Sequence, residues 1–154
     1  MMIVALSIPC MARERSRQCP VCTGRRAGRT RVSPVARNLV IKVTAGANEP
    51  ERCNQAFTVA ATAVASGVPV SLWLTGEAAW FALPGRAEGF ALPHAAPLPD
   101  LLASVLALGT VTVCSQCAAR RDIAPADVIA GVRIAGSATF VAEVVADDAQ
   151  ALVY

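Results

Sequence analysis

Short apolar runs alternate along the chain with longer stretches in which apolar side chains recur at helical spacing. The runs are rich in β-branched residues, and continuous apolar segments of this length are typical of strands buried on both faces of a parallel sheet. The predicted strands are residues 39–45, 68–75, 110–114 and 149–154, with 132–135 as a further short strand or extended link.

Apolar positions three and four residues apart predict helices between these strands. Asn48 is the predicted N-cap of the first helix, and Pro50 suits its first turn. The loop at residues 84–97 is rich in proline and glycine and is therefore expected to be irregular. The predicted helices are residues 51–66, 99–108 and 137–146, with shorter helical segments at 76–83, 115–121 and 125–131.

Alternation of strands and helices predicts an α/β fold with parallel connections. We expect a single domain with a mostly parallel sheet of about five strands and helices on both faces. The composition, 55% hydrophobic and 16% charged, excludes disorder across the whole chain. The chain contains neither the GxGxxG nor the Walker A pattern, which argues against nucleotide enzymes of those types.

Charge divides the chain into two parts. Residues 1–37 contain eight arginines and one acidic residue, whereas residues 38–154 carry a net charge of −4. The arginines follow the opening apolar run, which is the reverse of a secretory signal. We expect residues 1–37 to be a disordered extension or the product of an upstream start codon, with a basic arm for nucleic acid as the alternative. We expect no membrane partner, because no apolar stretch is long enough to span a bilayer.

Cys114 occupies the position with the clearest chemical meaning. It ends the predicted strand 110–114 and precedes a short helical segment, and ligands bind at the carboxyl ends of strands in open α/β sheets. The positive end of a helix dipole favours the thiolate, and Arg120 and Arg121 add positive potential. The pattern predicts a nucleophilic sulfur, and the alternative is a buried, inert core cysteine.

Cys117 completes a Cys-x-x-Cys motif with Cys114, and the sequence leaves two roles for it. It is either a thiol that resolves a persulfide or disulfide on Cys114, or a side chain that packs against the sheet. Two other cysteines, Cys10 and Cys53, are expected to be bystanders. The single histidine, His94, lies in the predicted irregular loop, so the chain offers no Ser-His-Asp triad.

A second Cys-x-x-Cys motif, at Cys19 and Cys22, raises the alternative of a zinc site. Four thiolates suit tetrahedral zinc, but 91 residues separate the two motifs. A compact zinc ribbon has a gap of about 15–20 residues. We therefore expect no metal, and a zinc-binding protein associated with nucleic acid remains the alternative.

The segment Val113–Ile123 resembles the active-site segment of the DsrE-like sulfur-relay family, which includes the DsrE and TusD subunits. The family pattern is a strand, a cysteine, a short Ala-rich helix and a basic pair. By this resemblance Cys114 matches the cysteine that accepts sulfur as a persulfide, and Arg120 and Arg121 match the basic pair. The similarity covers residues 38–154 and none of the extension.

Two residues depart from the family pattern. Asp122 stands where the family usually has glycine, so the turn after the basic pair is expected to differ. Cys117 stands where many members carry a small apolar residue, which suggests a thiol pair and a redox or persulfide-reductive role.

The resemblance implies a cytoplasmic sulfur carrier or sulfurtransferase-like protein with the persulfide on Cys114. It implies no metal and no organic cofactor, a homo-oligomer or an assembly with related subunits, and sulfur donor and acceptor proteins as partners. We expect no nucleic-acid partner. The second hypothesis is a non-catalytic, oligomeric binding module of the same fold, in which Cys114 is buried.

Overall fold

Five parallel strands form the sheet of the protein, in the order β4-β3-β2-β1-β5. The computed structural model describes residues 38–154, so the predicted extension lies outside the described residues. The central strands are nearly continuous apolar runs, as expected for strands that are covered on both faces. The strands are β1 (Asn38–Val43), β2 (Val70–Leu74), β3 (Thr110–Cys114), β4 (Val132–Ala135) and β5 (Ala149–Val153).

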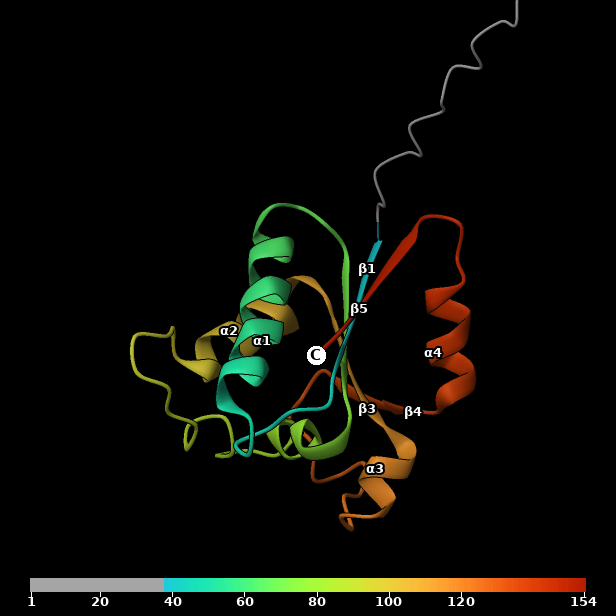
Figure 1. Cartoon of the computed structure of the whole chain (residues 1–154). Helices are drawn as coiled ribbons and strands as arrows, with labels where there is room; N and C mark the ends of the chain where they lie inside the picture. Colours follow the sequence, from blue (N-terminus) through green and yellow to red (C-terminus); the bar gives the residue numbers. More distant parts are fainter. Residues whose placement is uncertain (1–37) are drawn as a thin grey trace, which may run out of the picture. The chain divides into compact units, whose positions relative to one another are not determined.

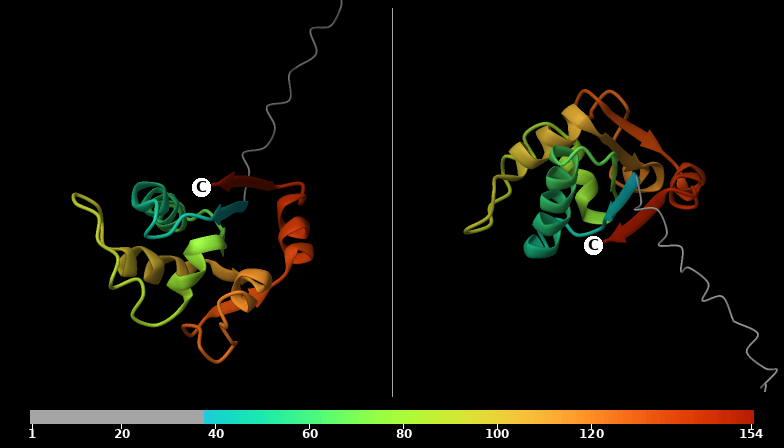
Figure 2. Two further views of the ribbon diagram at one scale, coloured as in Figure 1. Left: turned by 60° about the horizontal axis from the view of Figure 1, so that its bottom comes forward. Right: turned by 90° about the horizontal axis from the view of Figure 1, so that it is seen from above.

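Helices cover both faces of this sheet, as the alternating pattern predicted (Figures 1 and 2). On one face lie α1 (Pro50–Ala65) and α2 (Leu98–Leu108), which pack against each other and against the sheet. On the other face lies α4 (Ser137–Val144). Two short helices, the 3₁₀ helix η1 (Gly76–Ala82) and α3 (Ser115–Ala119), directly follow β2 and β3. The predicted α/β fold is confirmed.

The apolar core lies between the sheet and the pair α1 and α2. Alternate residues of the strands point into it and meet the apolar stripes of the two helices. Phe57 of α1 packs edge-on against Phe81 of η1, with ring centroids 6.0 Å apart. The largest fully buried aliphatic side chains on this side are Ile41, Val43, Leu72, Leu74, Leu98, Val105, Val111 and Val113.

A polar network joins α4 to the opposite face of the sheet. The carboxylate of Glu143 accepts hydrogen bonds from Ser71 Oγ at 2.6 Å and from Trp73 Nε1 at 2.7 Å. Arg133 forms an ion pair with Glu143 and donates from Nε to Thr112 Oγ1 at 2.7 Å. Each residue of α4 is at least partly exposed, so this network, more than burial, anchors the helix.

Two local predictions were wrong. Residues 125–131 form turns instead of a helix, because Asp127 Oδ2 accepts the backbone N–H of Ala124 and closes a turn there. Asn48 is not the N-cap of α1, which is Glu49. The Asn48 side chain instead accepts the N–H of Gly46 and shapes the turn before the helix.

Glycines allow two loops to approach closely at the carboxyl ends of β1 and β2. Gly76 has φ of +52°, and a Cβ there would lie 2.7 Å from the carbonyl oxygen of Thr44. A Cβ on Gly46 would lie 2.8 Å from Cβ of Glu77. Only glycine fits at these two positions.

Replacement of Gly76 by alanine is therefore expected to destabilise the fold more than the same change at Gly67. Gly67 also has positive φ, +78°, but a Cβ added there would meet no atom within 4 Å. Both changes carry the left-handed penalty of about 1–2 kcal/mol. Gly76→Ala adds about 1–3 kcal/mol of steric strain. Urea unfolding of both variants measures the difference, and equal losses of stability would contradict the close contact.

Candidate functional site

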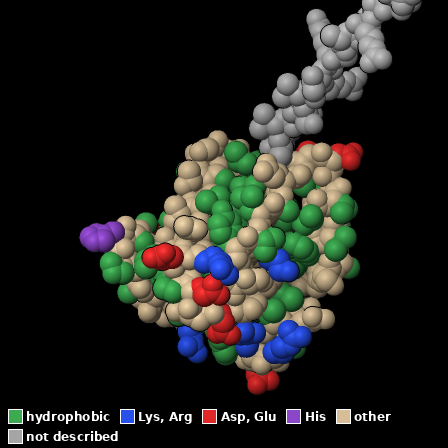
Figure 3. Space-filling model, viewed as in Figure 1, with side chains coloured by type: hydrophobic (Ala, Val, Ile, Leu, Met, Phe, Trp, Pro, Cys, Tyr) green, Lys and Arg blue, Asp and Glu red, His purple; other side chains and the backbone are tan. Residues whose placement is uncertain are grey.

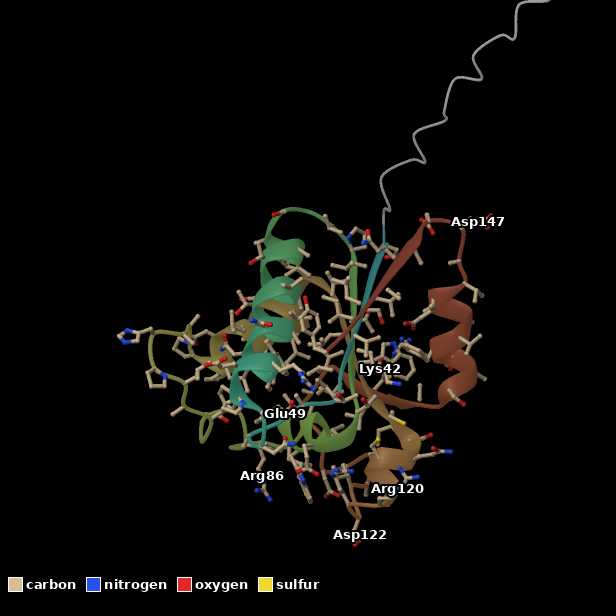
Figure 4. All side chains as sticks on the ribbon, in the orientation of Figure 1. Lys42, Glu49, Arg86, Arg120, Asp122 and Asp147 are labelled. Carbon is tan, nitrogen blue, oxygen red and sulfur yellow. The ribbon has the colours of Figure 1, made fainter. Side chains whose placement is uncertain are left out.

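The candidate site lies at the carboxyl end of the sheet, where β3 passes into α3. Cys114 is both the last residue of β3 and the N-cap of α3. Its pairing partner on β4 is Ala135, a small residue, and the Cys114 side chain is half-buried. Figure 4 places Lys42 and Arg120 at this end of the sheet and Asp147 at the opposite end. Charged side chains of both signs gather at this end (Figure 3).

The Cys114 thiol is shifted toward its ionised form. Burial acts first and would raise its pKa, but the backbone N–H of Cys117, the Cys117 thiol, the N–H of Gln116 and the charge of Lys42 all act in the opposite direction. The net result is a pKa below that of an ordinary thiol. The Cys114 side chain makes no capping hydrogen bond of standard geometry to the N–H groups of Gln116 and Cys117. These N–H groups therefore act on the thiol through their electrostatic field.

Lys42 is a member of the site that the sequence analysis missed. It lies on β1, on the face of the sheet that α4 covers, with its ammonium group 5.1 Å from the ring centroid of Phe140. Its charge contributes to the lowered pKa of Cys114. One signal was present, because Lys42 is the chain's only lysine and interrupts an otherwise apolar buried strand, where a charge is uncommon.

Cys117 lies one turn after Cys114 and faces inward. It is 8% exposed, and its sulfur accepts a hydrogen bond from the N–H of Gly76 at 3.2 Å. Its thiol also contributes to the lowered pKa of Cys114. The Cys-x-x-Cys pair thus consists of one half-buried sulfur and one buried sulfur, one helical turn apart.

The two arginines of the predicted site point in different directions. Arg121 forms an ion pair with Glu77 of η1 at 2.6 Å and donates to the carbonyl oxygen of Cys117 at 3.3 Å. Its guanidinium also stacks over Trp80, 5.7 Å from the ring centroid. Arg120, the C-cap of α3, is exposed (Figure 4). Arg121 therefore fastens α3 to η1, and stabilisation of an anion by either arginine stays a prediction.

The turn after the basic pair is closed by Asp122 in a conformation that favours glycine. Its φ is +54°, and the flanking N–H of Ile123 donates to the carbonyl oxygen of Ala118 at 3.0 Å. This is the Schellman arrangement that ends many helices. Asp is among the few residues that tolerate it, so the replacement of glycine is compatible with a compact end to α3.

Comparison with known proteins identifies the family. A family model described as DsrE/DsrF-like matches residues 37–150. The chain belongs to the DsrE/DsrF-like family. The resemblance noted in the segment around Cys114 is thereby confirmed, and it extends over nearly the whole described domain.

A solved structure supports the fold of this DsrE/DsrF-like protein. The crystal structure of the ychN protein from E. coli superposes with a TM-score of 0.63 at 18% sequence identity. The match covers 78% of this chain and 100% of that chain. Identity at this level supports the architecture alone. Among curated proteins, none matches the sequence significantly.

Neither a metal site nor a membrane span is present in the described part of the DsrE/DsrF-like chain. Residues 38–154 contain no group of three or more His, Cys, Asp or Glu side chains placed to hold a metal ion. The zinc alternative requires Cys19 and Cys22, which lie outside the described residues. In the same range no helix is long and apolar enough to cross a membrane.

A cavity of about 320 Å³ lies next to the site, between the β1–α1 loop and η1. Asn48, Glu77, Trp80, Arg86 and Phe90 are among its lining residues. Glu77 links this cavity to α3 through its ion pair with Arg121.

The thiols of this protein are expected to alkylate at very different rates. Cys53 is fully buried, and burial raises its pKa to about 12, whereas the pKa of Cys114 is lowered. In the folded protein iodoacetamide should modify Cys114 at neutral pH, with the rate reaching its plateau at a lower pH than for a free thiol. Cys53 should react only after unfolding.

Trypsin separates the two thiols, because residues 53–86 carry Cys53 alone and residues 87–120 carry Cys114 and Cys117. Fragmentation of the second peptide then assigns the label to one sulfur. A Cys114 that resists alkylation until the protein unfolds would contradict a reactive, half-buried thiolate and favour the binding-module hypothesis.

Proposed function

We propose that the protein is a sulfur carrier that accepts sulfane sulfur as a persulfide on Cys114, and that it is sulfurtransferase-like if it passes the sulfur on. The observation that carries this proposal is the half-buried Cys114 at the end of β3, with a lowered pKa. Membership of the DsrE/DsrF-like family supports it. Only the thiolate of a cysteine is nucleophilic, and this site favours the thiolate.

In the proposed reaction the Cys114 thiolate attacks the sulfane sulfur of a donor persulfide. A bond forms between this sulfur and Sγ of Cys114, the sulfur–sulfur bond of the donor breaks, and the donor leaves as a thiolate. The product is an anionic persulfide on Cys114. The N–H groups of Cys117 and Gln116 and the charge of Lys42, which act on the thiolate, are suited to stabilise this anion as well.

The proposed setting is the cytoplasm, where thiols are kept reduced. The three cysteines in the described residues are free, which agrees with this setting. The proposed partners are sulfur donor and acceptor proteins, within a homo-oligomer or an assembly with related subunits. Exposed apolar side chains on α4, at its C-cap and on β5 support an assembly: Val141 is 53% exposed, Val145 69% and Val153 68%.

Sulfur loading from inorganic polysulfide tests the function. The wild-type chain should gain the mass of sulfur in the peptide of residues 87–120, and Cys114→Ser should abolish this gain because the nucleophile is removed. Cys53→Ala should load like the wild type, since Cys53 is buried in the core. Peptide mass spectrometry after alkylation reads the result, and unchanged loading of Cys114→Ser would overturn the proposal.

Replacement of Lys42 tests the source of positive charge. Lys42→Met keeps an apolar stem beside Phe140 but removes the charge, so the pKa of Cys114 should rise. Below that pKa, alkylation and loading should slow by up to about tenfold, the factor that corresponds to one pKa unit. Lys42→Arg should retain most of the wild-type rate.

Arg120→Met, at the C-cap of α3, is the matched control, and the pH profile of Cys114 alkylation reads all three variants. A profile that moves with Arg120→Met and not with Lys42→Met would assign the cation to the arginine instead.

A further inference from the structure

We propose that Cys117 reductively releases the sulfur carried by Cys114, so that the protein converts a bound persulfide into sulfide and an internal Cys114–Cys117 disulfide. This inference rests on the proposed persulfide on Cys114. The inference goes beyond the carrier function because it assigns a second outcome to the sulfur on Cys114, namely release as sulfide in place of transfer to an acceptor. Three features of the described residues carry it.

The first feature is the spacing of the two cysteines at the start of α3. Cys114 is the N-cap of α3 and Cys117 is the third residue of that helix, and the Cys117 thiol is near enough to Cys114 to lower its pKa. Residues three apart at a helix start bring their Cβ atoms to about 5–6 Å. A disulfide requires Cβ atoms about 3.5–4.5 Å apart, so the two side chains must move about 1–2 Å closer to each other to form the bond.

The second feature is the difference in exposure of the two sulfurs. Cys117 is 8% exposed, whereas Cys114 is half-buried. Because Cys117 is buried and Cys114 is partly exposed, we expect an outer sulfur added to Cys114 to lie on its solvent side. Attack by Cys117 on Sγ of Cys114 would then push the outer sulfur toward solvent, which is the arrangement that displacement at sulfur requires.

The third feature is the N–H of Gly76, which donates to Cys117 Sγ at 3.2 Å. It fixes the direction of the side chain and supplies a donor to the negative charge that develops on this sulfur as its proton leaves. Gly76 itself is held against the carbonyl oxygen of Thr44, a place that admits no Cβ. The donor is therefore rigidly positioned.

The step balances in atoms and electrons. Cys117 passes its proton to the anionic outer sulfur, the Cys117 thiolate then forms a bond to Cys114 Sγ, and the bond between Cys114 Sγ and the outer sulfur breaks. The products are the disulfide and HS⁻. The sulfane sulfur gains two electrons, and the two cysteines lose them. Regeneration of the dithiol takes two electrons from an external thiol reductant, either a dithiol protein or a low-molecular-weight thiol.

A single-turnover experiment tests the release. The full chain is loaded with inorganic polysulfide, desalted and incubated without added thiol, while free sulfide and the peptide of residues 87–120 are followed over time. In the wild type, sulfide should appear as the persulfide disappears, and the peptide should end two hydrogens lighter than the unloaded dithiol peptide because of its disulfide. The rate should not depend on protein concentration, because the step is intramolecular.

Cys117→Ser and Cys117→Ala should load on Cys114 and hold the persulfide, with sulfide release slower by at least about tenfold. Two variants are used because Cys117 is buried, and thermal unfolding checks that each is folded. Cys53→Ala serves as the control and should release sulfide like the wild type. Addition of dithiothreitol after the reaction should restore the capacity of the wild type to load.

The outcomes separate the two proposals. A wild-type persulfide that persists without forming the disulfide would overturn the release step and leave the carrier function intact. Equal release from the wild type and both Cys117 variants would also overturn it. Absence of loading on Cys114 in every variant would instead overturn the carrier function on which the release depends.

Discussion

An all-parallel sheet must be covered on both faces. Because its strands run in one direction, the loops that follow the strands all start at the same edge of the sheet. In this protein that constraint brings together the ends of β1, β2 and β3, and with them Lys42, Gly76 and Cys114. These residues lie far apart in the sequence. The register of the sheet places them, and the fit of Gly76 against Thr44 at the edge holds the loops in position. The chemistry of the site is a consequence of strand pairing.

The two faces of the sheet are held by different forces, and this difference affects the site. Burial of aliphatic and aromatic side chains holds α1 and α2. Hydrogen bonds to Glu143 anchor α4: burial would raise the pKa of this carboxyl, but Ser71, Trp73 and Arg133 lower it below its usual range. Stability from this network is therefore present at neutral pH and is lost as the pH falls through the lowered pKa. Lys42 lies on this same face, against Phe140 of α4.

Most of the fold was predictable from the sequence because strand burial and helical spacing are local signals. The apolar run that ends at Cys114 indicated a strand. The glycines and prolines indicated where the helices end. The turn at Asp127 was not predictable from the sequence. The pattern of residues 125–131 also suits a helix, and the hydrogen bond from the N–H of Ala124 to the Asp127 side chain favours the turn instead. Lys42 was missed because its relation to Cys114 depends on the order of strands, which no single segment encodes. The ion pair of Arg121 with Glu77 joins two elements 44 residues apart and was invisible for the same reason.

The lowered pKa of Cys114 bears on both outcomes of a persulfide at this position. When an acceptor thiolate attacks the outer sulfur, Cys114 is the leaving group, and a thiol with a low pKa leaves faster. When Cys117 attacks, sulfide is the leaving group and Cys114 keeps its place in the new disulfide. The features that stabilise the Cys114 thiolate therefore favour transfer to an acceptor, whereas the contact between Cys117 and Gly76 favours release. An acceptor that reaches the half-buried sulfur of Cys114 competes with the buried thiol of Cys117, which is always present. The local concentration of the acceptor therefore decides whether the outer sulfur is transferred or released.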